Sequence, residues 1–555
     1  MKGIFLIYFL TLFYISEAQE IKNYIPFSIT HKYTHINKTY KLRPLNLEQI
    51  RRDDSIQFLQ NRSLNVASLQ GFNFEAIKSS EIKQLSDSQS VWRVSISIPK
   101  ARKIALKIEN IFLPQGSRLF IYTENQQDHF LVFDASQSNY RANTFISKAI
   151  IGETLILEYN QIISSEQTPS LNIDGCVNFY KNIEANPGFG QSTDCEVNVA
   201  CSEGDNWCKE AQSVVRILIQ EGTSYSYCSG ALINNTKQDK APYILTAEHC
   251  GSKSSDEDCK YWKFDFNYQS ESCQSPNSEA EIKTHQISGC EKIAEAGRIS
   301  GSGSDFRLIK LLDYIPETWN VYYAGWDKKE YNTISGGGVS IHHPYGDIKK
   351  ISTYTQDLTS SDANGGNESD EYWRTYWVAT ENGHGITEAG SSGSPLFNYS
   401  GLIIGTLSTG SSFCDNRKTS PDFYGKVSKH WDKNGTESYM QLKPWLDPLN
   451  SNVNQLGGIY GGEEITCKGK IYFEDFTIFP NPANRTISIG NDNLDYLAGA
   501  VFEIYDMNGK LISTYKSDLS IGVKRIDIHT LAEGVYILKV VQTAWVIQQK
   551  FVILR

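Results

Sequence analysis

The chain has 555 residues, which is more than one hydrophobic core supports, so we expect three or four domains. Hydrophobic residues make up 40% and charged residues 21%, a composition that excludes a disordered chain. The formal net charge of −10 argues against nucleic acid as a main partner. Aromatic residues reach 12% and Met occurs only 3 times, a bias that favours strands over helices.

Residues 1–18 have the pattern of a signal peptide. Lys2 supplies the charged end, residues 4–15 form an apolar run too short to span a bilayer, and Ser16-Glu17-Ala18 offers a cleavage site. A buried strand or helix is the alternative. Since no later run of about 18 apolar residues occurs, we expect no transmembrane segment in the mature chain.

Residues 19–185 are predicted to form a β-rich propeptide domain. Apolar and polar residues alternate over short runs such as 91–98 and 118–122, the period of half-buried strands. No catalytic pattern occurs in this part, and a permanent N-terminal domain is the alternative. It contains Cys176; the other ten of the 11 cysteines lie between Cys195 and Cys467. Removal of the propeptide would leave an even number, which suits a fully paired secreted domain.

Residues 186–448 contain three segments that carry chemistry. His249 ends an apolar run, Asp305 opens an apolar strand, and Ser392 lies in the glycine-rich turn 390–395. A base, an orienting acid and a nucleophile in the order His, Asp, Ser is the chain order of chymotrypsin-type proteases. The spacing suits one β-barrel that holds His and Asp, and a second that holds Ser.

Each residue type fits its role in this chemistry. A serine hydroxyl is a weak nucleophile until a base such as His249 removes its proton, and a carboxylate such as Asp305 fixes the imidazole tautomer. The N–H groups of Gly390 and Ser392 would form the oxyanion hole, each worth roughly 10²–10³ in rate. Taken alone, the serine-glycine turn could equally be a loop without chemistry.

Cys228 and Cys250 lie on either side of this histidine segment. A bridge between them would pin the histidine loop to the preceding strand and contribute roughly 2–4 kcal/mol. A bridge to some other cysteine is the alternative.

Several short motifs together resemble the secreted bacterial lysyl endopeptidase family, from about Cys195 to Pro448. The motifs, in order, are Cys195-x5-Cys201, Cys228-Ser229-Gly230-Ala231-Leu232, Leu245-Thr246-Ala247-Glu248-His249-Cys250, Ser304-Asp305-Phe306, Ala324-Gly325-Trp326-Asp327, Ile341-His342-His343-Pro344 and the segment 385–395.

The resemblance implies a trypsin/chymotrypsin fold and a chymotrypsin-like double β-barrel. It also implies that the triad is His249, Asp305 and Ser392. The disulfides that it implies are Cys195–Cys414, Cys201–Cys273 and Cys228–Cys250. It assigns no partner to the remaining four cysteines, Cys208, Cys259, Cys290 and Cys467.

Substrate specificity depends on a carboxylate at the base of the pocket, because a buried cationic P1 side chain needs a counter-charge. By the resemblance, Asp422 is that residue, with Asp415 as a nearby competitor. Ser408 and Gly410 would lie on the strand that pairs with substrate. The family carries a histidine, which helps to select lysine, where this chain has Ser408. Cleavage after Arg as well as Lys is therefore an alternative for this chain.

Three further features are structural or regulatory predictions. Chymotrypsin-like zymogens have an aspartate where this chain has Ser391. A new N-terminal ammonium would therefore find no carboxylate to pair with at this position. Lys181 is a candidate self-cleavage point. His342 and His343 could suggest a metal site, but neighbours on a strand face opposite ways, which favours a structural role. A helix is predicted over Ser438–Leu446, with Pro444 as a potential break.

Residues 449–474 are predicted to be a glycine-containing linker, and residues 475–555 a small C-terminal β-sandwich. Asn508-Gly509 between alternating runs is a hairpin signal. Three segments at 479–483, 505–510 and 531–540 resemble the type IX secretion C-terminal sorting domain, which implies outer-membrane export followed by release or surface attachment. A carbohydrate-binding sandwich is the alternative.

The sequence therefore predicts an all-β, secreted serine endopeptidase that cuts after Lys, with Arg open, through a His-Asp-Ser triad. Its expected partners are protein or peptide substrates with basic P1 residues and the type IX secretion machinery. We expect no cofactor and no metal. The alternative function is a catalytically inactive surface-binding protein built on a protease fold; another P1 preference is the third option.

Overall fold

The computed structural model describes residues 25–555 with gaps. The gaps are 51, 53–64, 124–128, 135–143, 163–166, 168, 181–188, 298–302, 332, 335, 363–365, 367–369, 416–418, 466, 468–476, 491–500, 508, 517–523 and 543–544. The predicted signal peptide, Lys181 and Asn508 lie outside the described residues. Within the described part, no helix has both the length and the apolar character needed to cross a membrane.

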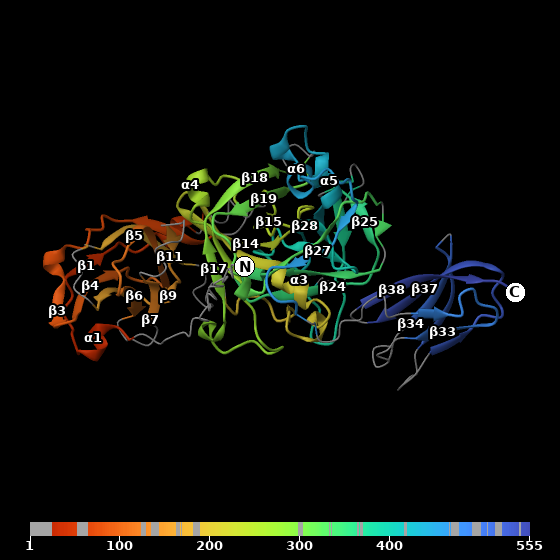
Figure 1. The fold of residues 1–555 in the computed structure, drawn as a ribbon, viewed down its shortest axis with the longest axis horizontal. Coiled ribbons are helices and arrows are strands. Elements are labelled where there is room, and N and C mark those ends of the chain that lie inside the picture. Colours follow the sequence, from red (N-terminus) through yellow and green to blue (C-terminus); the bar gives the residue numbers. More distant parts are fainter. Residues whose placement is uncertain are drawn as a thin grey trace, which may run out of the picture.

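The N-terminal domain, described between residues 25 and 180, consists of two β-sheets around a common core (Figure 1). One sheet has the order β1-β4-β10-β6-β7, with β3 beside β4; the other has the order β2-β11-β5-β8, with β9 beside β5. The elements are α1 (Phe27–Thr30), β1 (Lys38–Lys41), β2 (Asn65–Gly71), η1 (Ser79–Glu81), β3 (Lys83–Ser86), β4 (Gln89–Ser97), β5 (Lys103–Phe112), β6 (Ser117–Thr123), β7 (His129–Asp134), β8 (Phe145–Ile146), β9 (Ile150–Ile151), β10 (Thr154–Gln161) and β11 (Ser170–Phe179).

The central domain, residues 189–465 as described, begins with a sheet in the order β17-β16-β13-β14-β15-β19-β18. Its strands are rich in β-branched and aromatic residues, which pack well on a pleated surface. The elements of this half are β12 (Val197–Asn198), η3 (Ser202–Gly204), α3 (Cys208–Ser213), β13 (Val214–Glu221), β14 (Ser224–Leu232), β15 (Tyr243–Thr246), α4 (Asp256–Cys259), β16 (Lys263–Phe266), η4 (Glu279–Glu281), β17 (His285–Ser288), β18 (Cys290–Ala296) and β19 (Phe306–Leu311).

A second sheet of the central domain has the order β12-β24-β23-β27-β28-β29-β26-β25-β22, with β21 joined to β28 and β30. Its elements are η6 (Glu317–Trp319), β20 (Tyr322–Tyr323), β21 (Trp326–Asp327), β22 (Thr333–Ile334), β23 (Gly338–His342), η7 (Pro344–Gly346), β24 (Lys350–Tyr354), β25 (Leu358–Ser361), β26 (Tyr372–Thr375), β27 (Pro395–Asn398), β28 (Ile403–Gly410), β29 (Asp422–Lys426), α5 (Val427–Asp432), η8 (Ser438–Met440), α6 (Lys443–Leu446), β30 (Gln455–Leu456) and β31 (Ile459–Tyr460).

One apolar core joins the two sheets of the central domain. Leu245 and Leu308 from the first sheet pack with Phe397 and Ile403 from the second. This core fixes the two sheets against each other, so loops from both sheets can meet at their border. The prediction of an all-β chain is confirmed.

Two predictions at the end of the central domain are corrected. The predicted helix over Ser438–Leu446 is split into η8 and α6, because Gln441 is extended (φ −138°, ψ 146°) and Pro444 lies in the first turn of α6. The predicted linker is not free over its first part: β30 pairs with β21, and β31 pairs with β20. These pairs close the central domain.

The C-terminal domain, residues 477–555 as described, has two small antiparallel sheets around one core. They have the orders β32-β33-β36 and β35-β34-β37-β38. The predicted hairpin is present, since β34 and β35 pair and Gly509 has φ 79° in the turn. The strands are β32 (Thr477–Phe479), β33 (Thr486–Gly490), β34 (Val501–Asp506), β35 (Leu511–Lys516), β36 (Lys524–Asp527), β37 (Gly534–Gln542) and β38 (Trp545–Ile553).

The structure contains the three disulfides that the family resemblance implied, together with a fourth, Cys208–Cys467. The fourth bridge ties α3 to the segment after β31. Cys176, Cys259 and Cys290 are buried free thiols. Cys176 is in β11 of the N-terminal domain, whereas Cys259 and Cys290 lie in the core beneath β13 and β19.

We expect Cys259 and Cys290 to form a fifth disulfide in the exported protein. The Cys290 thiol contacts the Cys259 carbonyl at 3.6 Å, and both side chains are buried in the same apolar cluster. Exchange with a disulfide donor would remove two electrons and two protons from the pair. Intact mass with thiol alkylation under denaturing, non-reducing conditions should show Cys176 as the one free thiol of the full-length chain. Labelling of all three cysteines would contradict this.

Candidate active site

Strand pairing brings His249 and Asp305 together from positions 56 residues apart. β15 pairs antiparallel with β19, with Thr246 opposite Arg307. The residues that follow β15 therefore lie beside those that precede β19. Arg307, which is 1% exposed, adds a second link because its guanidinium donates to the carbonyls of Cys250 and Gly251 at 2.9 and 2.8 Å.

The Asp305 carboxylate makes two bonds to His249. The ring Nδ1 lies 2.7 Å from Oδ2, and the backbone N–H of His249 donates to Oδ1 at 3.0 Å. Asp305 is completely buried, while the His249 side chain is 12% exposed. The Nδ1–H tautomer leaves Nε2 as the acceptor. Asp305 has a positive φ of 59°, a conformation that Asp tolerates better than most residues and that is common at functional sites.

Ser408 holds the same carboxylate from the second sheet. Its hydroxyl donates to Asp305 Oδ2 at 2.5 Å. The pairing of β28 with β29 skips one residue between Leu407 and Thr409, so Ser408 occupies a β-bulge. Bulges redirect side chains next to active sites. The structure therefore places the Ser408 side chain on Asp305, a role that the sequence analysis, which put it on the substrate strand, did not foresee.

A neutral histidine lies behind Asp305. His430 is fully buried, and its ring bonds to the hydroxyls of Ser304 (2.7 Å) and Thr406 (3.0 Å). Burial lowers the pKa of His430 to about 3, so the ring is uncharged at neutral pH. The ring fixes Ser304, the residue before Asp305, and adds no positive charge near the Asp305 carboxylate.

The Ser392 turn packs against the loop that carries His249. The N–H of Ser229 donates to the Ser392 carbonyl at 2.8 Å. A Cβ on Gly393 would lie 2.1 Å from Thr246 Oγ1 and 2.8 Å from the Ala247 nitrogen, so only glycine fits. Within the described residues, no hydrogen bond joins Ser392 Oγ to the His249 ring. Contacts of this kind are often long before substrate binds.

Within the part of the chain that the structure describes, the backbone of this turn leaves undonated the two N–H groups that the sequence analysis assigned to an oxyanion hole. Gly390 has φ 95°, and a Cβ there would lie 2.9 Å from both His343 O and Tyr345 N. The Ser229 hydroxyl donates to the Gly390 carbonyl at 2.9 Å and so holds it back. Among the backbone hydrogen bonds of the described residues, neither the Gly390 N–H nor the Ser392 N–H is donated. Both donors are free for a developing negative charge.

Ser391 is anchored by a chain of neutral hydrogen bonds. The Glu388 N–H donates to Ser391 Oγ at 3.2 Å, and Ser391 Oγ lies 2.8 Å from His342 Nδ1. His342 Nε2 lies 3.0 Å from Ser352 Oγ, which donates to the Ile386 carbonyl at 2.7 Å. Burial lowers the pKa of His342 to about 3, which keeps the ring neutral. Each donor in the chain thus has one acceptor.

The two adjacent histidines have separate partners. His343 Nδ1 bonds to the Asp347 carbonyl at 2.8 Å, and its backbone N–H donates to Ser229 Oγ at 2.9 Å. No group of three or more metal-ligating side chains occurs among the described residues. Each ring therefore links a different pair of loop segments through its own hydrogen bonds.

Asp422 links segments 386–390 and 408–412, because it accepts hydrogen bonds from residues of both. It is opposite Gly410 in the β28–β29 pairing and is completely buried. Five donors surround its carboxylate, and burial raises its pKa despite them. They are Trp377 Nε1 (2.6 Å), Thr387 Oγ1 (2.7 Å), Ser412 Oγ (2.6 Å) and the N–H groups of Ser411 and Ser412 (both 3.1 Å). Asp415, the other aspartate considered as the specificity carboxylate, is exposed.

Sequence reasoning missed Trp377, Thr387, Ser412, His342 and His430 as parts of this site. Single buried serines, threonines and histidines have no distinctive pattern along a chain. The available signals were Thr387, which lies in the same segment as Ser392, and His342, which lies in the motif 341–344 and was given only a structural role.

Comparisons with known proteins match two separate parts of the chain. The family model "Lysyl endopeptidase, C-terminal domain" matches residues 189–425, and "Secretion system C-terminal sorting domain" matches residues 477–554. The chain is 26% identical over 302 residues to the lysyl endopeptidase of Pseudomonas aeruginosa; the alignment covers 51% of this chain and 61% of that protein. The chain thus spans less than two thirds of that relative's length.

Two solved structures show a weaker similarity. Human heparin binding protein aligns with a TM-score of 0.28 and 15% identity, over 40% of this chain and 88% of that one. A mutant of the same protein aligns with a TM-score of 0.27 and 15% identity, over 44% and 93%. TM-scores this low carry no weight for function.

We expect His342→Leu to lower kcat about tenfold to a hundredfold with little change in KM, because Ser391 and the neighbouring oxyanion N–H groups lose their anchor. His342→Asn, which can still bond to Ser391, should recover part of the loss. Steady-state kinetics on a lysyl peptide ester, with thermal unfolding to check the fold, would measure this. An unchanged kcat in the leucine variant would refute the positioning role.

Proposed function

We propose that this secreted, lysyl endopeptidase-like protein is a serine endopeptidase that cuts peptide bonds after Lys, and also accepts Arg. The observation that carries the proposal is the His249 ring held on the buried Asp305 carboxylate beside the Ser392 turn. The sorting domain at residues 477–554 supports the type IX secretion machinery as a partner during export.

In the proposed mechanism, Ser392 Oγ attacks the carbonyl carbon of the scissile bond while His249 Nε2 takes the hydroxyl proton. Asp305 stays ionised and stabilises the imidazolium through Nδ1–H. The N–H groups of Gly390 and Ser392 receive the oxyanion. His249 then gives the proton to the leaving amine, and an acyl-enzyme on Ser392 remains. Water, activated by the same imidazole, attacks this ester and releases the new carboxyl terminus.

The proposed P1 pocket is built around the Asp422 charge. A carboxylate there offsets the desolvation of an ammonium or guanidinium group. The hydroxyls of Thr387 and Ser412, which donate to Asp422, keep lone pairs that can accept from the P1 cation. Because Ser408 is small and turned toward Asp305, it leaves room beside the substrate strand, which supports the acceptance of Arg.

We expect Ser392→Ala to abolish peptide hydrolysis and Asp305→Asn to lower kcat on the order of 10⁴-fold, because the amide favours the wrong imidazole tautomer. Labelling of the wild-type chain with a serine-directed phosphonate, followed by mass spectrometry, should modify Ser392 alone. An unlabelled, inactive wild-type chain would favour the surface-binding alternative.

We expect Asp422→Asn to lower kcat/KM for lysyl substrates by about 10²–10³-fold, because the P1 cation would be buried without a counter-charge. Asp415→Asn is the matched control and should change kcat/KM less than twofold. Digestion of one denatured protein, with mapping of the new carboxyl termini, would measure P1 preference directly. Cleavage after acidic or apolar residues by the wild-type enzyme would contradict the proposed specificity.

A further inference from the structure

The N-terminal and central domains share one continuous sheet. Along the same edge of β14, β15 pairs with Ala231 and Leu232, while β2 of the N-terminal domain pairs with residues 224–226. The register places Ala67 opposite Tyr225, and the Leu69 N–H donates to the Thr223 carbonyl at 2.7 Å. β2 thus fills the part of the β14 edge that β15 leaves open. An open edge of this kind readily accepts another strand.

An apolar cluster seals this junction. Tyr225 and Tyr261 of the central domain are 0% and 1% exposed, and both belong to a cluster with side chains from the N-terminal domain. The N-terminal members are Val66, Ala67, Ala105, Ile146, Val177 and Phe179, and the central members are Leu218, Tyr225, Tyr227 and Tyr261. Separation of the domains would return these surfaces to water, which is unfavourable.

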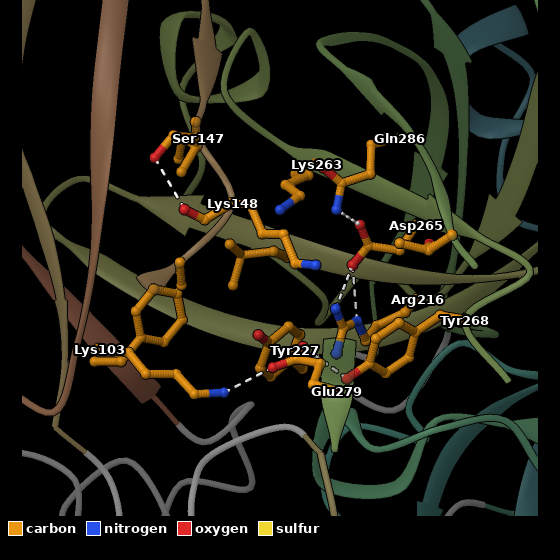
Figure 2. A pocket seen from close by; sticks show the side chains of 15 residues that line it. Lys103, Ser147, Lys148, Arg216, Tyr227, Lys263, Asp265, Tyr268, Glu279 and Gln286 are labelled. Atoms are coloured by element: carbon orange, nitrogen blue, oxygen red, sulfur yellow. Dashed lines mark hydrogen bonds and ion pairs between the residues drawn. The ribbon is translucent and has the colours of Figure 1, made fainter. Parts of the chain in front are cut away.

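Charged groups also meet across the junction, around a small cavity (Figure 2). Lys103 of the N-terminal domain, 4% exposed, bonds to Glu279 Oε2 at 2.8 Å, and Glu279 Oε1 accepts from the Tyr268 hydroxyl at 2.8 Å. The Arg216 guanidinium lies 3.4 Å from the Tyr268 ring centre and pairs with Asp265 at 2.6 Å. Burial raises the pKa of Glu279, but Lys103 and Arg216 outweigh it and bring it to about 2.

A second cationic contact supports the same surface. The Lys107 ammonium lies 3.8 Å from the centre of the Tyr261 ring, and the Tyr261 hydroxyl donates to Glu109. Both partners of Tyr261 are on β5. The interface therefore combines backbone pairing, apolar burial and desolvated charge pairs, the three features of a stable protein interface.

We propose that the N-terminal domain is a strand-donating partner that stays bound to the central domain after the chain between them is cut. A cut within residues 181–188 removes none of the contacts above, so its product is a non-covalent complex rather than a free central domain. None of the interface residues is a member of the catalytic site described above. His249 and Ser392 are both partly exposed with the N-terminal domain in place, so the cut complex keeps an accessible site. Release of the central domain then needs a second event, such as destruction of the N-terminal domain.

The test uses the full chain with Ser392→Ala, so that its outcome does not depend on the proposed peptidase activity. A recognition sequence for a viral cysteine protease is placed within residues 181–188 and cut. Gel filtration at neutral pH and micromolar concentration should show both fragments in one peak at the mass of the uncut chain. Elution in two separate peaks would overturn the proposal.

Two neutralising variants test the buried ion pair. Glu279→Gln and Lys103→Met should each raise the dissociation constant of the cut complex at least about tenfold. The first leaves the buried Lys103 ammonium without its counter-charge, and the second removes the ion pair that crosses the junction. Glu271→Gln removes an exposed ion pair with Lys283 and is the matched control. Dissociation constants for both variants within twofold of the control would overturn the role assigned to Lys103 and Glu279.

Discussion

The buried carboxylate of Asp305 is the constraint on which the site depends. A fully buried charge is tolerated only when hydrogen-bond donors surround it. Here the donors come from the His249 ring and backbone in the first sheet and from Ser408 in the second. The same three bonds that satisfy the charge therefore fix the imidazole and join the two sheets. The positive φ of Asp305 and the bulge at Ser408 are local irregularities that this arrangement requires.

The nucleophile turn is held by neutral groups rather than by an ion pair. A directed chain of hydrogen bonds passes from the Glu388 N–H through Ser391, His342 and Ser352 to a backbone carbonyl. The turn has this shape in the uncut chain, with the buried Glu196 carboxyl 3.9 Å from His342 Nε2. This arrangement is compatible with the prediction that activation does not use a new N-terminal ammonium at Ser391.

One edge of β14 pairs with strands from two different domains. The half of β14 near Ala231 pairs with the strand that positions His249, and the half near Tyr225 pairs with the N-terminal domain. The N-terminal domain thereby supports the sheet that carries the histidine, from a surface away from the catalytic groups. The C-terminal domain has its own core, and its match to a secretion sorting domain explains its separation from the chemistry.

The sequence by itself determined the all-β class, the order of its strand-rich parts, the small C-terminal β unit, and the chemical types at positions 249, 305 and 392. Alternating apolar residues and turn signals are local properties, so they can be recognised in one chain. The family resemblance added three disulfide pairs that the structure also contains. The helix predicted over Ser438–Leu446 was wrong, because Gln441 adopts an extended conformation that local propensity did not reveal.

Only the tertiary structure decided what surrounds those residues. Three features depend on contacts between segments that are distant in sequence. Ser408 bonds to Asp305, His342 bonds to Ser391, and five donors surround Asp422. The same holds for the pairing of β2 with β14 and for the Cys208–Cys467 bridge. Such contacts are set by sheet register and by the packing of two sheets on one core, and neither leaves a periodic signal in the sequence.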